Sequence, residues 1–280
     1  MKFSVSGALS YQVKSAATFI LNIHALRTPD QSVLKETFTV DPHSNSEELV
    51  AQTENRFVRF EVTESAYVNV NYHAVIDTSY KQTAGHLLTD VPVMQMDNTV
   101  IPYFFPSRYC QSDKLFRFAH NKFGKIDNAF EKVCALTDWI HDNVEYLSGS
   151  TTSQTSAYDT VTEQAGVCRD FAHLGIALCR ALDIPARYFT GYAYQLNPPD
   201  FHACFEAFMG GQWVIFDATK LVPLNGLVKI ATGRDAAEAA IASIFGDVTS
   251  TFISASCQLA ADSFEPIYYD SNNPIGLTYL

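Results

Sequence analysis

Three residues in the second half of the chain could together perform acyl transfer: Cys168, His202 and Asp217. A thiolate can attack a carbonyl carbon, an imidazole can remove and return the proton, and a carboxylate can orient the imidazole. Cys168 falls in the first turn of a predicted helix, where free N–H groups and the helix dipole stabilise a thiolate. A cysteine on an apolar helical stripe is more often a core residue, as Cys179 on the same stripe illustrates.

A predicted hairpin brings His202 and Asp217 together. If Gly210-Gly211 forms a two-residue turn, the flanking strands pair outward from it residue by residue. Cys204 then lies opposite Asp217, and His202 lies one diagonal away on the same face. The imidazole and the carboxylate can hydrogen-bond there, which leaves the other ring nitrogen free to face a thiol. A shift of pairing by one residue would reverse the faces.

In the segments that carry these residues, the spacing of the apolar side chains changes along the chain from the period of a helix to that of a strand. A helix is predicted over 128–144, with Asn128 and Glu131 as a capping pattern, and a second over Val167–Leu182, ended by Ile184-Pro185. Strands are predicted at 186–196, 201–209 and 212–217, followed by an alanine-rich helix near 235–245 and a strand near 251–259. Helices first and strands afterwards predict an α+β domain.

The first 80 residues alternate apolar and polar side chains with a period of two. Strands with one polar face are typical of an antiparallel β-sandwich. Prolines 92, 102 and 106 then interrupt regular structure between Val91 and Asp113. We therefore expect a β-sandwich domain at 1–95, a linker at 96–120 and a catalytic domain at 121–280.

Several short blocks occur in a fixed order around these residues. They are Gly166-Val167-Cys168-Arg169-Asp170-Phe171-Ala172-His173, Ile184-Pro185-Ala186-Arg187, Gly191-Tyr192, His202-x-x-x-Glu206 and Trp213-x-x-x-Asp217-x-Thr219. Together the blocks resemble the core of bacterial transglutaminase-like proteins described as cysteine proteases, and the β-rich start is similar to that family's N-terminal domain. Cys204 stands where the family usually has tryptophan, and Ala218 where proline commonly follows the aspartate. The first departure concerns the packing beside His202.

This resemblance implies a papain-like transglutaminase core preceded by the antiparallel β-sandwich. It also implies roles: Cys168 as nucleophile, His202 as general base and acid, and Asp217 as orienting carboxylate. A thioester would form and be resolved by either water or an amine. Hydrolysis of a peptide or amide bond, with water as the acceptor, is the first choice. Crosslinking of proteins by an amine is the alternative, and a non-catalytic binding protein on the same fold is a third.

The oxyanion of such a reaction needs hydrogen-bond donors. The backbone N–H of Cys168 is one, because it points out of a helix start, and Gln164 and Trp139 are candidates for the second. His173 lies on a different side of its helix from Cys168 and is expected to be structural. Other polar residues have two readings each. Arg169 with Asp170 can form a capping or ion-pairing set or take part in function, and Glu206 can touch substrate or bind a backbone group.

Composition excludes several classes of function. The chain has 280 residues, 47% of them hydrophobic, and a formal net charge of −11. Intrinsic disorder is excluded, and so are nucleic acid and anionic membranes as partners, because both need clustered Lys and Arg. No apolar run reaches the ~18 residues of a membrane span, and no signal peptide is evident, so a cytoplasmic protein is expected.

The six cysteines include no CxxC pair and are expected to be free thiols. Zinc sites normally show closely spaced Cys or His ligands, and only His202 with Cys204 lies close. We therefore expect no metal and no other cofactor. The expected partner is a peptide or protein substrate, or a small amide, and the oligomeric state stays open.

Overall fold

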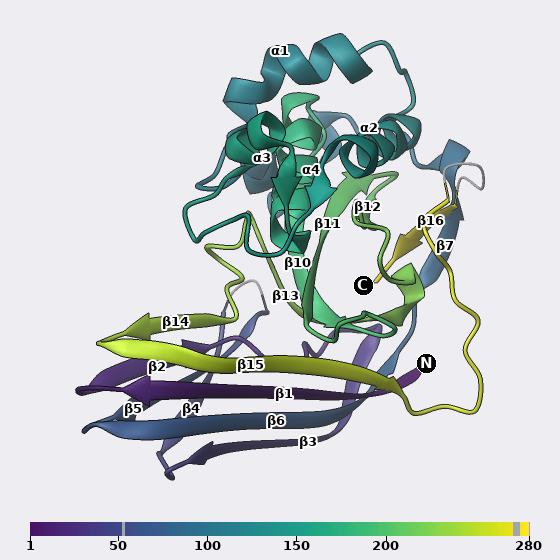
Figure 1. Ribbon diagram of the computed structural model, residues 1–280. Helices are drawn as coiled ribbons and strands as arrows, with labels where there is room; N and C mark the ends of the chain where they lie inside the picture. The colour runs from purple at the N-terminus through teal and green to yellow at the C-terminus, as the bar shows by residue number, and fades with distance from the viewer. Residues whose placement is uncertain (52–53, 271–274, 280) are drawn as a thin grey trace.

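Two antiparallel sheets form a long β-sandwich along one side of the computed structural model, which describes residues 1–51, 54–270 and 275–279. Figure 1 shows this sandwich beneath a part that combines helices with a smaller sheet. The strand orders of the sandwich are β15-β1-β6-β3 and β14-β2-β5-β4. Its strands are β1 (Lys2–Val13), β2 (Ala17–Leu21), β3 (Gln31–Asp41), β4 (Ser46–Val50), β5 (Arg56–Val62), β6 (Ala66–Thr78), β14 (Ala242–Phe245) and β15 (Val248–Leu259).

The period-two pattern explains why these segments form a sandwich. In β6, alternate residues are buried and exposed over Val68–His73, as the sequence predicts. Phe19 of β2 and Phe60 of β5 stack in the interior with ring centroids 4.8 Å apart. Burying each such side chain contributes about 1.5–3 kcal/mol. The apolar face of each strand therefore holds the two sheets together.

Two strands of the sandwich come from the far end of the chain. β15 pairs with β1 from Phe3↔Leu259 to Val13↔Val248, and β14 pairs with β2. Both lie in the segment expected as part of the catalytic domain at 121–280, so the sandwich is larger than 1–95. The alternation of a strand specifies which face is buried but not which strand it pairs with.

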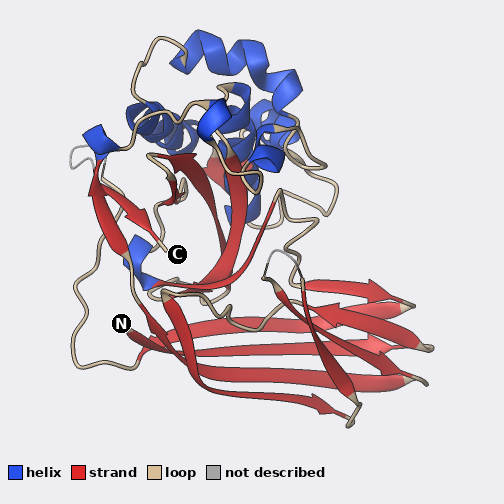
Figure 2. Cartoon of the chain, turned by 180° about the vertical axis from the view of Figure 1, so that it is seen from behind, coloured by secondary structure: helices blue, strands red, loops and turns tan. Residues whose placement is uncertain are grey.

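The second part of the fold packs helices on the sheet β12-β11-β10-β13 (Figure 2). Its helices are α1 (Ser112–Phe123), α2 (Ala129–Asn143), α3 (Ala157–Glu163) and α4 (Cys168–Ala181), and its strands are β10 (Ala186–Ala193), β11 (Phe201–Met209), β12 (Gln212–Phe216) and β13 (Leu227–Gly233). Two small pairs complete it: β8 (Glu145–Tyr146) with β9 (Ala165–Gly166), and β7 (Lys81–Ala84) with β16 (Ile275–Thr278). Short 3₁₀ helices lie at Gly85–Leu87, Val93–Gln95, Ile101–Phe104 and Leu224–Gly226. These observations give a mixed α+β protein with antiparallel main sheets.

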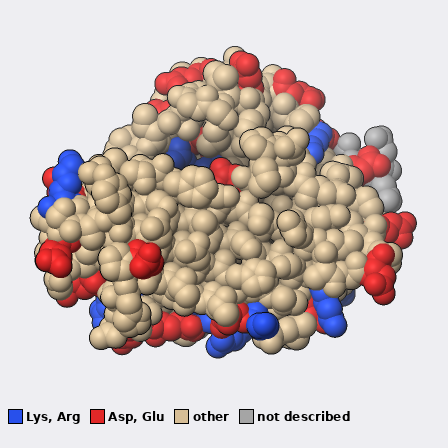
Figure 3. Space-filling view, turned by 60° about the horizontal axis from the view of Figure 1, so that its bottom comes forward, with Lys and Arg blue, Asp and Glu red and all other residues tan. Residues whose placement is uncertain are grey.

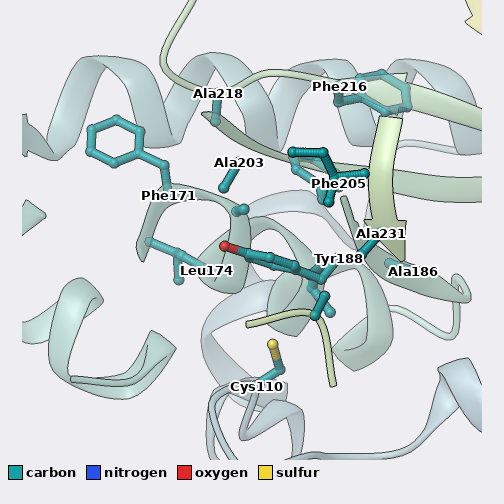
Figure 4. Packing of buried hydrophobic residues seen from close by; sticks show 14 of the residues in the cluster. Cys110, Phe171, Leu174, Ala186, Tyr188, Ala203, Phe205, Phe216, Ala218 and Ala231 are labelled. Atoms are coloured by element: carbon teal, nitrogen blue, oxygen red, sulfur yellow. The ribbon is translucent and has the colours of Figure 1, made fainter. Parts of the chain in front are cut away.

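Helix α4 is almost entirely buried between the sheet and its neighbouring helices. Gly175 allows the closest approach, because a Cβ there would lie 2.5 Å from the Phe205 ring of β11. Figure 4 shows Phe205 among the buried residues that include Phe171 and Leu174 of α4. This packing fixes the position of the α4 N-terminus, where Cys168 stands.

Most predicted elements of this part are confirmed. The side chain of Asn128 accepts a hydrogen bond from the Glu131 N–H at 3.0 Å and caps α2. The hairpin register is confirmed too, because Met209 pairs with Gln212 across the turn.

The predicted helix near 235–245 is wrong. The chain forms turns there before β14 begins at Ala242. The Asp235 carboxylate accepts the N–H of Ala237 at 2.9 Å and the N–H of Tyr109 at 2.8 Å. These side-chain hydrogen bonds compete with a helical ladder, and the segment must also cross from β13 to β14.

The segment 96–120, expected as a linker, contains the 3₁₀ helix Ile101–Phe104 and most of α1. The described part of the chain contains no helix with the length and hydropathy needed to cross a bilayer.

Candidate active site

Cys168 is the first residue of α4, and its helix start is capped. The Asp170 carboxylate accepts the Val167 N–H at 3.0 Å, which satisfies a backbone donor before the first turn. Cys168 is partly exposed and lines a cavity of about 600 Å³. Its thiol is therefore both at a helix N-terminus and open to a ligand.

His202 and Asp217 are hydrogen-bonded beside this cavity. The Nε2–H of His202 donates to Oδ2 of Asp217 at 2.9 Å, and both side chains are buried. The other carboxylate oxygen accepts the backbone N–H of Thr219 at 2.9 Å and its hydroxyl at 2.7 Å. Asp217 is thus held in place from the turn that follows β12, and it holds the ring of His202.

Two opposing effects act on the imidazole of His202. Burial alone would lower the pKa of His202, but the Asp217 carboxylate outweighs it and raises the pKa well above its ordinary value. The Cys168 thiol adds to this increase of the pKa, and Cys168 and His202 line the same cavity. Nδ1 of His202 has no hydrogen-bond partner among the described residues. The nitrogen that does not face Asp217 is therefore available to the thiol.

Tyr146 lies near the start of α4, although no pattern in the sequence predicts it. Burial, with a smaller contribution from the Cys168 thiol, raises the pKa of Tyr146 to about 12. The short parallel pair β8–β9 places it there by aligning Tyr146 with Gly166. A two-residue strand has no periodicity, so no signal in the sequence marks this residue.

The two predicted candidates for a second oxyanion donor have other roles in the fold. The Trp139 ring packs against Phe118 at 5.0 Å and Phe123 at 6.4 Å, between α1 and α2. Gln164 ends α3 in a left-handed conformation, and its carbonyl accepts the Glu145 N–H at 2.8 Å. In this way Gln164 helps to hold the strand that carries Tyr146.

Cys204 lies directly behind the pair of His202 and Asp217. One donor atom from each of the three residues lies within 4.8 Å of the others, and all three residues are buried. Burial, with the Asp217 carboxylate, raises the pKa of the Cys204 thiol to about 12. The three donors could hold a metal ion, but Nε2 and Oδ2 are already hydrogen-bonded to each other.

The remaining polar residues near the site have structural partners. Nε2 of His173 accepts the Ala236 N–H at 3.1 Å, as expected for a structural histidine, and burial lowers the pKa of His173 to about 3. Arg169 forms an ion pair with Asp170 at 3.1 Å. Glu206 is fully buried and pairs with Lys229 at 2.8 Å and with Arg187. The expected capping and ion-pairing set of Arg169 and Asp170 is thus present, and Arg169 also lines the cavity. Glu206 has a structural role, but its partners are side chains and not the expected backbone group.

The cavity beside Cys168 is mainly apolar. Its wall includes four alanines of the segment after β13, at 236, 239, 240 and 242, together with Ile241 and Ile253. Asp200 also lines it, and burial raises the pKa of that carboxyl group. The cavity can therefore hold apolar groups near the thiol and places one acidic group at its wall.

All six cysteines are unpaired, as the sequence predicts. Burial raises the pKa of the other five thiols, which are those of Cys110, Cys134, Cys179, Cys204 and Cys257. A thiol with a raised pKa has little thiolate near neutral pH and reacts slowly.

Comparison with known proteins agrees with the fold. The family described as "Bacterial transglutaminase, N-terminal domain" matches residues 1–99, and the "Transglutaminase-like superfamily" matches residues 117–218. A crystal structure from Cytophaga hutchinsonii, named a "Putative Cysteine Protease", is 58% identical to this chain, with a TM-score of 0.98. The similarity covers 100% of this chain and 98% of that one.

Two curated relatives match shorter parts. An uncharacterized protein of Mycobacterium leprae is 27% identical over 139 residues, which is 46% of this chain and 50% of that protein. One from Mycobacterium tuberculosis is 41% identical over 64 residues, 23% of this chain and 20% of that protein. The matches thus span half of the first relative and a fifth of the second. From the two family matches and the full-length structural relative, we conclude that this chain belongs to the transglutaminase-like superfamily and carries the bacterial transglutaminase N-terminal domain ahead of its core.

Proposed function

We propose that this protein is a cysteine-dependent acyl-transfer enzyme that hydrolyses peptide or amide bonds through a thioester. The observation that carries the proposal is the arrangement, at one cavity, of a thiol at a helix start and a histidine whose ring is hydrogen-bonded to a buried carboxylate. Nucleophile, base, orienting group and oxyanion donors are the parts that such a reaction needs.

In the first half-reaction the Cys168 thiol gives its proton to Nδ1 of His202, and its sulfur bonds to the substrate carbonyl carbon. The carbonyl oxygen becomes an oxyanion, which the Cys168 N–H and the Tyr146 hydroxyl can bind. His202 then donates its proton to the leaving amine as the carbon–nitrogen bond breaks. Asp217 stabilises the imidazolium during this step and holds the tautomer that presents Nδ1 to the thiol.

In the second half-reaction water gives a proton to His202 while its oxygen bonds to the thioester carbon. The carbon–sulfur bond breaks, the proton returns to sulfur, and the acid leaves. Protein crosslinking differs only here, because an amine replaces water. Asp200 supports this second candidate, since a carboxylate at the cavity wall can attract the ammonium group of a lysine before that group loses its proton.

The test uses intact-protein mass spectrometry after a limiting dose of iodoacetamide near neutral pH, with peptide mapping. Cys168 is expected to alkylate before the five other cysteines. Glutamine, peptide and ester probes are then supplied with and without a labelled primary amine, to wild type and to Cys168→Ala. Free acid that depends on Cys168 supports hydrolysis, and predominant amine adduct supports crosslinking. An inert Cys168 and no product from any probe would favour a non-catalytic binding protein.

The proposal includes a cytoplasmic location. The six unpaired thiols support it, because secreted proteins of oxidising compartments commonly pair their cysteines. Cell fractionation with an antibody to the protein tests it, and recovery in the periplasmic fraction would contradict it.

A further inference from the structure

One strand of the sandwich has a free edge that runs into the catalytic cavity. In the strand order β15-β1-β6-β3, β15 pairs with β1 on one side, and no strand of the described chain pairs with its other side. Ile253 of β15 lines the same cavity as Cys168 and His202. The edge strand therefore contributes a wall residue to the cavity that contains the thiol.

The longest exposed run of β15 contains the residue that lines the cavity. Five consecutive residues, 249–253, are exposed, and Ala255 is buried again. Gly7 of β1, the partner of Ala255, lies against Tyr192 of β10 and Phe201 of β11. The strands β10 and β11 therefore cover the sandwich near Gly7 and Ala255, and they leave the edge of β15 open over 249–253.

Nothing in the composition of this edge protects it from pairing. Sheet proteins commonly blunt a free edge with lysine, with proline or with a charged side chain. The stretch Val248–Leu259 contains no charged residue and no proline, and Phe252 and Ile253 are 53% and 52% exposed. Figure 3 shows the sandwich side of the molecule, where the charged residues gather mainly along the margins of the visible face.

We infer that an extended polypeptide adds as a further strand to the β15 edge over 249–253 and is thereby presented to Cys168. A free edge offers alternating N–H and C=O groups, and another extended backbone matches that row in register. The apolar cavity then receives a side chain near the scissile carbonyl. The inference rests on the proposed function and deepens it, because the substrate becomes a polypeptide rather than a small amide.

The probes are two chloromethyl ketones, whose carbon bonds to the Cys168 sulfur as chloride leaves. The short reagent carries a single acetylated alanine, and the long one carries an alternating alanine and valine peptide, since backbone pairing tolerates sequence. Each net hydrogen bond changes an affinity roughly two- to tenfold. The long reagent is therefore expected to label Cys168 at least about tenfold faster than the short one. N-methylation of alternate amides of the long reagent should remove this advantage, and methylation of the intervening amides should not.

Substitutions in β15 provide the matched test on the protein. Neighbouring residues of a strand direct their N–H groups to opposite sides. Of Thr249→Pro and Ser250→Pro, one therefore removes a hydrogen bond to β1, and the other removes only an N–H group on the free edge. The variant that keeps the wild-type free energy of unfolding should be labelled by the long reagent no faster than by the short one. Thr39→Pro, in the opposite edge strand β3, should keep the faster labelling by the long reagent. Labelling by iodoacetamide should be equal in all folded variants.

Two results would overturn the inference: equal labelling by the long and short reagents, or an advantage that survives both prolines and every pattern of N-methylation. The protein could instead be a dimer that the edge-donor proline variant converts to a monomer, with no faster labelling by the long reagent. That result would assign the edge to a second copy of this chain. The proposed function fails separately, through a Cys168 that iodoacetamide does not label. In that event, fluorescence anisotropy with Cys168→Ala still tests whether a peptide binds at the β15 edge. The fluorescein-labelled alanine and valine peptide should bind more tightly than its N-methylated form.

Discussion

Tyr146 pairs with Gly166, two residues before Cys168 at the start of α4. In this parallel ladder of two residues, the Leu147 N–H also donates to the Gly166 carbonyl at 2.9 Å. The Cys168 thiol also contributes to the raised pKa of Tyr146. In the proposed mechanism, the Tyr146 hydroxyl stabilises two successive negative charges, first the thiolate and then the oxyanion.

Tyr146→Phe removes that hydroxyl and keeps the ring, which packs near Phe171 at 5.8 Å. The turnover number should fall by about 10²–10³, the usual effect of losing one oxyanion donor, with little change in KM. Steady-state kinetics on the best probe measure this. Tyr158→Phe, at an exposed position on α3, is the control and should behave as wild type. Unchanged turnover in Tyr146→Phe would remove this residue from the mechanism.

Asp217→Asn keeps the shape of the side chain but weakens its hold on the His202 ring. We expect a folded enzyme whose turnover is lower by about 10²–10⁴, whereas Cys168→Ala should have none and His202→Ala almost none. Asp138→Asn, in a half-exposed ion pair with Lys220, serves as the control. Equal activity of Asp217→Asn and wild type, at matched stability, would exclude the orienting role.

The same pair predicts a pH dependence of stability. The folded-state pKa of His202 is raised, with Asp217 as the main cause of the increase, so the imidazolium is favoured in the folded protein. This contribution is fully present below the unfolded pKa of about 6.5 and is lost as pH rises through the folded pKa. The difference in unfolding free energy between wild type and Asp217→Asn should therefore be largest below about pH 6.5 and shrink above it. Urea titrations across this range measure the difference, and a gap that widens with pH would contradict the assignment.

Gly175→Ala tests the packing that positions the helix start. The added Cβ would lie 2.5 Å from the Phe205 ring, so β11 and α4 must separate. We expect a loss of about 1–3 kcal/mol in unfolding free energy, with lower activity from a displaced Cys168. Phe205→Leu in the same chain should restore part of the stability, which a double-mutant cycle quantifies. Additive effects of the two substitutions would show that the contact does not couple them.

Local pattern was sufficient for much of this protein. The alternation of Val68, Val70 and Tyr72 determines which face of β6 is buried, and the capping residue Asn128 determines where α2 begins. The two glycines at 210 and 211 adopt positive φ angles, and this fixes the register that carries His202 to Asp217. Each of these features depends on neighbours along the chain, and their physical causes are therefore present in the sequence itself.

Contacts between distant segments were decided only by the tertiary structure. The alanines after β13 predicted a helix, but the Asp235 carboxylate and the crossing to β14 give turns and place small side chains on the cavity wall. The pairing of β15 with β1 and the position of Tyr146 beside Cys168 have no local signal, since strand alternation names no partner and a two-residue strand has no period. The sequence by itself determined the nucleophile, the histidine and the carboxylate as candidates. Only folding decided which hydroxyl, which cavity wall and which strand edge surround them, because those neighbours come from energies of packing and pairing that act across the whole chain.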